Sequence, residues 1–148
     1  AWYLGSTSFG FAQVDLRHYH LVACQMVWAK KLLYRQASGS VPFHELAVAG
    51  GSEFGRGYFE GRFRDNRLLG IENELRWQFH KRFAWNFFFS GFQVGKQPLP
   101  LFQNPWQYAY GTGIRIFVNP KERVALRLDV ARTAEGQMAF YIDLSEAF

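Results

Sequence analysis

Apolar and polar residues alternate along most of the chain with the two-residue period of a β-strand. From Leu69 to Gln78, apolar side chains fall on one face, while Glu72, Glu74 and Arg76 fall on the other. The alternation predicts seven strands: Phe11–Tyr19, Leu21–Tyr34, Leu69–Gln78, Phe83–Val94, Tyr108–Val118, Arg123–Ala131 and Met138–Phe148. Residues 21–34 could also form a helix, but their β-branched and aromatic side chains favour a strand. The chain is therefore expected to be all-β and antiparallel, in up-and-down order.

A long glycine-rich segment separates the second predicted strand from the third. Residues 36–68 are expected to form a loop of roughly thirty residues, a length usually associated with function. Five glycines weaken any regular element here: Gly50, Gly51, Gly55, Gly57 and Gly61. Arginines and aromatic residues lie between them: Phe54, Arg56, Tyr58, Phe59, Arg62, Phe63 and Arg64. A loop with this aromatic content is expected to pack against another part of the chain. Shorter connections are expected at 96–106, 119–122 and 134–136.

Size and composition narrow the class of protein. The 148 residues suit one domain, which begins at Ala1 without Met and could be a mature form, a processed domain or a fragment. The net charge of +5 allows an acidic partner without requiring one. No stretch approaches the ~20 apolar residues of a transmembrane helix. The alternation fits either a soluble barrel with its apolar face inward or a membrane barrel with that face outward. Strands of about ten residues, tilted by about 45°, have the length needed to cross a bilayer, which favours the membrane barrel.

Isolated polar pairs give only weak chemical signals. His18 and His20 share one face and could supply two metal ligands, but no third ligand is evident, and an interfacial role is favoured. Glu72 and Glu74 could form an acid–base pair, although structural pairing with neighbouring charges is favoured. Cys24 is the single cysteine, which excludes an internal disulfide, and is expected to be an inert buried or lipid-facing thiol. We expect no enzymatic activity, no metal and no cofactor.

The basic and aromatic run from Arg56 to Arg67 could instead bind single-stranded nucleic acid. Glu60 and Asp65 reduce its positive field, so no nucleic-acid partner is expected. Four tryptophans are expected either in a core or in a girdle at a membrane interface: Trp28, Trp77, Trp85 and Trp106.

Several short motifs follow one another in a set order. They are Gly50-Gly51, Arg56-Gly57-Tyr58, Gly61-Arg62-Phe63-Arg64-Asp65, Glu74-Leu75-Arg76, Gly111-Thr112-Gly113-Ile114-Arg115, Arg127-Leu128-Asp129 and Glu146-Ala147-Phe148. In this order the chain, from about Phe9 onward, resembles the C-terminal barrel region of the bacterial surface-antigen superfamily. This superfamily contains the BamA/TamA-like outer-membrane assembly and secretion proteins.

The resemblance implies a transmembrane β-barrel in the Gram-negative outer membrane. Family barrels have sixteen strands, with a seam between the first and last and a long extracellular loop folded back into the lumen. Residues 1–148 supply seven strands, or eight if Ala1–Leu4 adds one. The interior of an eight-stranded barrel is filled by its own side chains, so the loop 36–68 would not fit there. The chain is therefore expected to be the C-terminal half of a wider barrel. Completion by a second copy, or a loop outside the barrel, remains open.

The resemblance also implies a function and partners. The barrel would assist insertion or translocation of other proteins, with the final strand pairing weakly at the seam and templating a client strand. The expected partners are outer-membrane lipid, client outer-membrane or secreted proteins, and the remainder of the barrel. The assembly machinery would recognise a C-terminal signal formed by Phe140, Ile142, Leu144 and Phe148. Two alternatives remain: a membrane anchor for an upstream soluble domain, possibly a hydrolase, and a soluble barrel that binds an apolar ligand.

Arg56 is the central residue of the expected site. The loop motif comprises Gly50, Gly51, Arg56, Gly57 and Tyr58. Many family members carry an Asp, as partner of this arginine, where this chain has Phe89. The expected partner therefore shifts to Glu74 or Asp129, which the alternation places on the charged inner face. The candidate lumen partners are Glu74, Arg76, Arg115 and Asp129.

Overall fold

The computed structural model describes residues 8–96, 105–119 and 124–146, and confirms that the chain is all-β. Its elements are β1 (Phe9–Ala23), β2 (Met26–Gly39), the 3-10 helix η1 (Phe43–Glu45), β3 (Ala47–Ala49), β4 (Phe63–Asp65), β5 (Arg67–His80), β6 (Phe83–Gly95), β7 (Gln107–Asn119), β8 (Val124–Thr133) and β9 (Met138–Glu146). No helix in this part of the chain is long and apolar enough to span a membrane.

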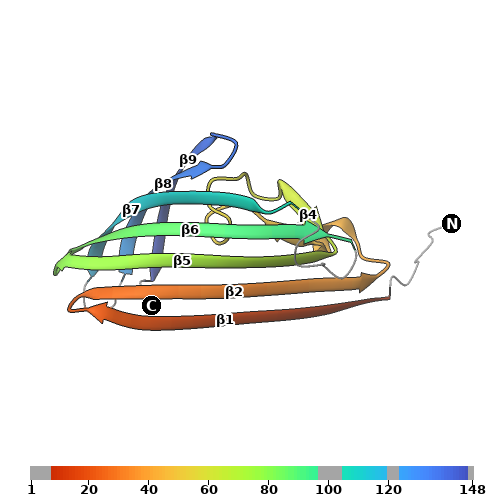
Figure 1. Ribbon diagram of the computed structural model, residues 1–148, viewed down its shortest axis with the longest axis horizontal. Helices are drawn as coiled ribbons and strands as arrows, with labels where there is room; N and C mark the ends of the chain where they lie inside the picture. Colours follow the sequence, from red (N-terminus) through yellow and green to blue (C-terminus); the bar gives the residue numbers. More distant parts are fainter. Residues whose placement is uncertain (1–7, 97–104, 120–123, 147–148) are drawn as a thin grey trace.

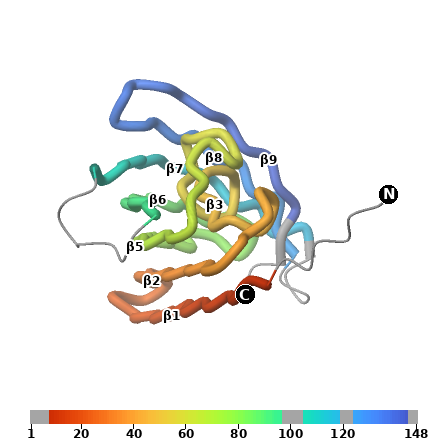
Figure 2. The backbone as a smooth tube through the Cα atoms, turned by 90° about the vertical axis from the view of Figure 1, so that its right-hand side faces the viewer, coloured from red at the N-terminus to blue at the C-terminus, as the bar shows by residue number. Residues whose placement is uncertain are grey.

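Seven of the strands form one antiparallel sheet in the order β1-β2-β5-β6-β7-β8-β9, as the alternation predicts (Figure 1). Each strand pairs with the next long strand along the chain, so the topology is up-and-down. The sheet curves around the segment that joins β2 to β5, which therefore lies on its concave side (Figure 2). Within the described residues β1 and β9 each pair on one side only, so the sheet has two free edges.

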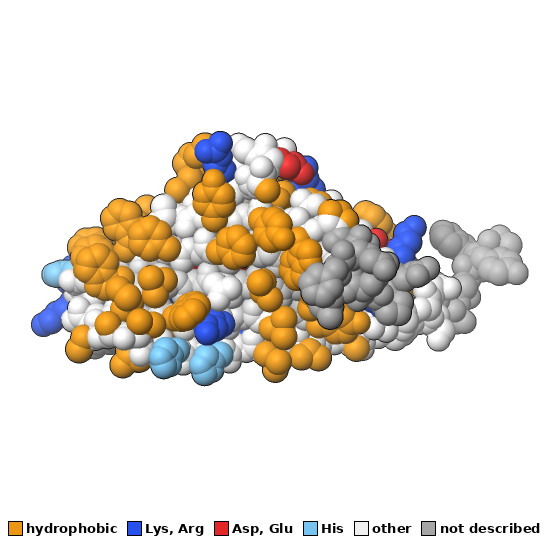
Figure 3. Space-filling view, viewed as in Figure 1, with side chains coloured by type: hydrophobic (Ala, Val, Ile, Leu, Met, Phe, Trp, Pro, Cys, Tyr) orange, Lys and Arg blue, Asp and Glu red, His pale blue; other side chains and the backbone are white. Residues whose placement is uncertain are grey.

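The two faces of the sheet differ in chemistry because side chains alternate across a strand. In β6, Asn86, Phe88 and Ser90 are buried on the concave face. Trp85 and Phe87 point to the convex face and are 42% and 53% exposed. Large apolar side chains cover much of the convex face over the first strands of the sheet (Figure 3). The exposed set includes Val14, Leu16, Trp28, Leu32, Ile71, Trp77, Trp85, Phe87, Phe89, Tyr108, Tyr110, Phe140, Ile142 and Leu144.

The turn between the first two strands differs from the prediction. The pattern predicts a break between Tyr19 and Leu21, but β1 continues to Ala23 and β2 begins at Met26. Gln25 has a φ of 68° in the two-residue turn, a conformation for which Gly or Asn is the usual signal. Cys24 is exposed in this turn, so its predicted place within a strand and the buried alternative for its thiol are wrong.

The long loop contains more structure than the pattern predicts. It is shortened by the extension of β2 to Gly39 and the start of β5 at Arg67, and it contains η1 and the β3–β4 hairpin. Phe54, Tyr58 and Phe63 of the loop pack in one apolar cluster at the concave face, as its composition predicts, whereas Phe43 and Phe59 are exposed. The cluster contains Leu33, Ala47, Ala49, Phe54, Tyr58, Leu68, Phe92 and Ala109.

The remaining predicted segments are only partly described. The turn at 134–136 lies between β8 and β9, as predicted. Ala1–Leu4, residues 97–104 and 120–123, and Phe148 lie outside the described residues.

Candidate functional site

The backbone of the glycine-rich loop folds back on itself above the concave face. The Gly50 amide donates to the Phe54 carbonyl at 3.0 Å, and the Gly51 amide donates to the Tyr58 carbonyl at 2.9 Å. Gly57 has a φ of +113°, and a Cβ there would lie 3.2 Å from the Ala109 methyl. Glycine is therefore needed at this position for both its conformation and its close approach to the sheet. The turn directs the side chain of the preceding residue, Arg56, towards the strands.

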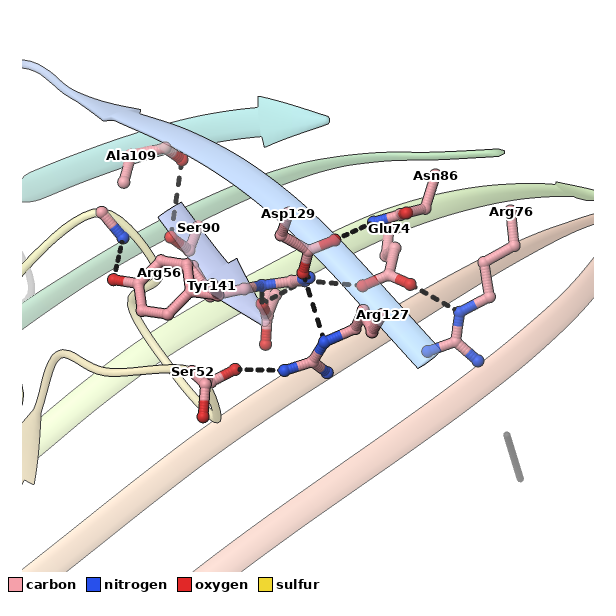
Figure 4. Close-up of polar contacts among 12 residues, drawn as sticks. Ser52, Arg56, Glu74, Arg76, Asn86, Ser90, Ala109, Arg127, Asp129 and Tyr141 are labelled. Carbon is pink, nitrogen blue, oxygen red and sulfur yellow. Dashed lines mark hydrogen bonds and ion pairs between the residues drawn. The ribbon is translucent and has the colours of Figure 1, made fainter. Parts of the chain in front are cut away.

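Arg56 is the centre of a buried ionic site. It is 3% exposed and donates four hydrogen bonds to three carboxylates (Figure 4). Nη1 lies 2.8 Å from Asp129 Oδ2. Nη2 lies 2.8 Å from Glu72 Oε1 and 2.6 Å from Glu74 Oε2, and Nε lies 3.2 Å from the same Glu72 oxygen. The guanidinium therefore joins β5, which carries both glutamates, to β8, three strands away in the sheet.

Three further arginines surround these carboxylates. Arg76 Nε donates to Glu74 Oε1 at 2.7 Å, and Arg115 contacts the same oxygen. Arg127 Nε lies 3.3 Å from Asp129 Oδ2, and Arg127 Nη2 donates to the Ser52 carbonyl at 3.2 Å.

A fourth carboxylate completes the charge balance. Arg127 Nη2 also lies 3.1 Å from Asp143 Oδ2. We call the whole set the Arg56 network: Arg56, Arg76, Arg115, Arg127, Glu72, Glu74, Asp129 and Asp143. Its four positive charges equal its four negative charges, as burial of so many ionised groups requires.

Aromatic and amide side chains complete the site. The Arg56 guanidinium lies 3.7 Å from the centroid of the Phe88 ring, within the range of a cation–π interaction. Asn86 Nδ2 donates to Asp129 Oδ1 at 3.3 Å. Gly113, the residue opposite Asp129 in β7, leaves room for this carboxylate, because a Cβ there would overlap Asp129 Oδ1.

Neighbouring carboxylates keep Arg56 protonated. Burial by itself would lower the pKa of Arg56, but Glu72, Glu74 and Asp129 outweigh burial and raise that pKa above its usual value. The Arg56 guanidinium is therefore charged at neutral pH. Because burial lowers the pKa of Arg56 and the three carboxylates raise it, the buried charge depends on these carboxylates.

Tyr58 anchors the loop beside Arg56. It is fully buried, and its hydroxyl donates to the Tyr108 carbonyl at 3.0 Å. Its ring meets Phe63 and Phe92 edge to face, with centroids 5.0 and 5.6 Å apart. Burial raises the pKa of Tyr58, so its hydroxyl remains a donor at neutral pH. Its neighbour Phe59 is 83% exposed and takes no part in this packing.

The loop also contacts the edge strand β9 and the turn before it. The Gly57 amide donates to the Tyr141 hydroxyl at 2.9 Å (Figure 4). That hydroxyl donates to the Tyr58 carbonyl at 3.3 Å. Arg62 Nη2 lies 2.6 Å from Glu135 Oε2 in the β8–β9 turn. The loop is therefore bound to the strand at one free edge of the sheet as well as to the interior strands.

The structure brings most of the expected site residues together. Arg56 contacts both Glu74 and Asp129, the alternatives that the sequence offers, while Arg76 and Arg115 contact Glu74 and not Arg56. Phe89 is exposed on the convex face and lies outside the site. Gly50, Gly51, Gly57 and Tyr58 form the turn that holds Arg56.

The expected set of lumen partners leaves out three residues of the site, although structural pairing of one of them, Glu72, with neighbouring charges was predicted and is confirmed. Glu72, Phe88 and Tyr141 each contact the loop from the concave face. The alternation places Glu72 and Tyr141 on that face, so the signal was present for both. The site of the expected C-terminal signal is partly described: Phe140, Ile142 and Leu144 lie exposed on β9.

The site is suited to holding a loop in place. Glu72, Glu74 and Asp129 each accept hydrogen bonds from Arg56, so these carboxylates are already engaged by a cation. Among the described residues, no group of three or more His, Cys, Asp or Glu side chains could hold a metal ion.

A comparison with models of protein families gave no match, and a search of curated proteins found no significant relative. The resemblance to BamA/TamA-like proteins therefore stays a prediction from the motifs.

Proposed function

We propose that this chain forms part of a transmembrane β-barrel of the Gram-negative outer membrane. In this proposal the barrel belongs with the BamA/TamA-like proteins and assists the insertion or translocation of other proteins. The observation that carries the proposal is the polarity of the curved sheet. Its concave face holds a buried ionic network under a folded loop, while large apolar side chains cover its convex face.

The apolar convex face favours a lipid environment. On β9, Phe140 and Ile142 are 77% and 78% exposed. Full burial of such a side chain is worth about 1.5–3 kcal/mol relative to water, so many of them facing water would be costly. A soluble barrel would place these side chains inside and its charges outside, the reverse of the observed distribution. Lipid around the convex face would remove the cost of exposing these apolar side chains to water.

The loop supports a barrel wider than seven strands could close. The interior of an eight-stranded barrel is filled by strand side chains alone. Here the concave side also accommodates the Arg56 network and the aromatic cluster around Tyr58. The two free edges are the places where the remaining strands would pair, supplied either by the same polypeptide or by a second copy.

The free edge of β9 supports a role in strand insertion. An edge strand presents unpaired backbone N–H and C=O groups, which a second strand can pair with by β-augmentation. β9 pairs with β8 from Met138 to Glu146 and has no strand on its other side among the described residues. A client strand that adds to this edge would lie in register with the existing sheet.

Photo-crosslinking in cells tests this function. A crosslinking amino acid replaces Ile142 on β9, and the matched control replaces Phe87, which is exposed on the same face of β6 but has strands on both sides. We expect crosslinks to unfolded outer-membrane proteins from position 142 and none from position 87. The two sites giving the same products would contradict the insertion role.

A gel assay tests the membrane barrel separately. The protein extracted in detergent should migrate differently before and after boiling, as membrane barrels do. A heat-modifiable protein without client crosslinks would support the membrane-anchor alternative. A protein that stays soluble without detergent would refute the barrel.

A further inference from the structure

A polar patch interrupts the apolar convex face near the β1–β2 turn. Histidine side chains lie next to a basic side chain within this otherwise largely apolar region (Figure 3). They are His18 and His20 of β1 and Lys30 of β2, and all three are exposed. His18 and Lys30 are opposite each other in the β1–β2 pairing, and Lys30 is opposite Asn73 of β5. His18, Lys30 and Asn73 thus form a single polar row across three strands, and His20 lies beside it on β1.

The patch has no acidic partner in the described part of the protein. The described interaction of Lys30 is with Trp28, whose ring centroid lies 3.8 Å from Lys30 Nζ. The neighbouring Lys31 points to the opposite face, where it lies over Phe54 of the loop. A lysine that faces lipid without an anion is costly, so a partner for Lys30 is expected from the lipid itself.

We propose that His18, Lys30 and Asn73 bind the phosphate of an anionic phospholipid. This inference rests on the proposed function, because it requires the convex face to lie in a membrane. The lipid belongs to the leaflet at the end of the barrel where the short β1–β2 and β5–β6 turns lie. Its phosphate contacts the ammonium of Lys30, while the His18 and Asn73 side chains donate hydrogen bonds to phosphate oxygens.

The surface beside the patch accommodates an acyl chain. The next outward-facing row towards the long loop is formed by Leu16, Leu32 and Ile71, which are opposite one another across β1, β2 and β5. This row and the polar row line one open groove of about 400 Å³, together with Arg17, Lys31 and Glu72. The Glu72 carboxylate is engaged on the concave side by Arg56. The groove is therefore charged at one end and apolar at the other, as a phospholipid is.

The charged end of the groove lies nearer the membrane surface than its apolar end, as the position of Lys30 along β2 shows. Lys30 lies four residues from the start of β2 at Met26. At ~3.3 Å per residue and a tilt of about 45°, its Cα is roughly 9 Å from the short-turn end of the strand. Its ammonium lies over Trp28, two residues nearer to that end, as a lysine does when it extends towards the headgroups. The apolar row lies on the other side, deeper in the bilayer.

Fluorescence quenching by brominated lipids tests this site, because Trp28 touches Lys30. The full chain keeps Trp28, and the other four tryptophans are replaced by phenylalanine: Trp2, Trp77, Trp85 and Trp106. The protein is reconstituted in vesicles of phosphatidylcholine mixed with phosphatidylglycerol, with bromine on one lipid or the other. We expect phosphatidylglycerol to bind next to Trp28 about fivefold more tightly, the attraction expected of one basic side chain near anionic lipid.

Two variants separate the site from general charge effects. Lys30→Gln should abolish the preference, while Lys31→Gln, a change of the same chemistry on the opposite face, should retain it. Equal quenching by the two lipids in the parent protein would overturn the lipid site and leave the membrane barrel intact, as would a preference that survives Lys30→Gln. Absence of quenching by either lipid would show that Trp28 does not face lipid, and would overturn the proposed function as well.

Discussion

Replacement of Arg56 by alanine removes the side chain that joins the three carboxylates at the centre of the site. Four hydrogen bonds are lost, and their acceptors are affected unequally. Glu74 keeps Arg76 and Arg115, and Asp129 keeps Arg127. The ion pair of Glu72 in the described structure is with Arg56. The substitution therefore leaves a buried carboxylate without its cation and changes the network from neutral to a net negative charge.

Breaking a buried ion pair by removal of one partner costs about 3–5 kcal/mol. The loop limits this cost, because it can leave the concave face and let water reach Glu72. We therefore expect Arg56→Ala to release the loop before it unfolds the sheet. Chymotrypsin should then cleave after Tyr58, which is fully buried in the intact protein, whereas the neighbouring Phe59 is 83% exposed in the parent as well. Mass spectrometry of the fragments distinguishes the two cleavage sites, and the temperature of the heat-induced gel shift should fall.

Arg62→Ala is the matched control within the same loop. The Arg62 side chain is 31% exposed and pairs with Glu135, which is 43% exposed. Pairs of this kind contribute about 0–1 kcal/mol, so this variant should resemble the parent protein in both assays. If Arg56→Ala and Arg62→Ala released the loop equally, the buried network would not be what holds it.

A double variant tests whether the loop is released by the unpaired charge of Glu72 or by the loss of the Arg56 guanidinium itself. Arg56→Gln alone leaves Glu72 unpaired, whereas Arg56→Gln with Glu72→Gln restores neutrality without restoring the guanidinium. We expect the double variant to bind its loop more tightly than Arg56→Gln. The opposite order would indicate that Glu72 is hydrated and carries little of the cost.

Three further substitutions or reactions test other parts of the same account. Gly57→Ala should cost about 1–3 kcal/mol in unfolding free energy, because a strained positive φ and close packing coincide there, whereas Gly136→Ala in an open turn should cost less. Tyr141→Phe should weaken loop protection by about 1–2 kcal/mol through loss of the hydroxyl that accepts from Gly57, as measured by hydrogen exchange of that amide. The exposed Cys24 should react with a membrane-impermeant maleimide in detergent, but in intact cells only after the outer membrane is permeabilised, since the proposal places its turn in the periplasm. Labelling of Cys24 in intact cells would contradict the proposed orientation, in which the long loop is extracellular and the β1–β2 turn is periplasmic.

The alternation predicted which side chains share the inner face, and the resemblance supplied Arg56 as their partner. The alternation placed Glu74 and Asp129 on the same inner face, and both contact Arg56. The misplaced first turn did not disturb this prediction, because Glu74 and Asp129 lie on other strands, β5 and β8, where the two-residue period was read correctly. Side chains are therefore assigned to the correct face of the sheet even when the ends of a strand are misplaced, as long as the alternation within it is read correctly.

The geometry of contact could not be predicted, because it depends on register and on the path of the loop. Whether Glu72 or Glu74 reaches Arg56 depends on where the loop turn places the guanidinium, and the answer is both. Gly113 is opposite Asp129 only in the observed β7–β8 register. The path of the loop is set by several residues of positive φ, including Gly55 and Gly57, which alternation does not encode.

The loop connects the interior of the sheet to its edge, and this connection bears on how an insertion seam could work. Arg56 fixes the loop to β5 and β8, which belong to the central part of the sheet. Tyr141 and Glu135 then tie the same loop to β9 and the turn before it. If the free edge of β9 accepts a client strand, any movement of β9 away from β8 must first break these contacts. The contacts at the edge are a hydroxyl hydrogen bond and a partly exposed ion pair, which are weak beside the buried Arg56 network. If a client strand displaces β9, these loop contacts should therefore break before those of Arg56, and the loop would stay over the interior strands. Such a displacement would also have to break the pairing of β9 with β8 from Met138 to Glu146.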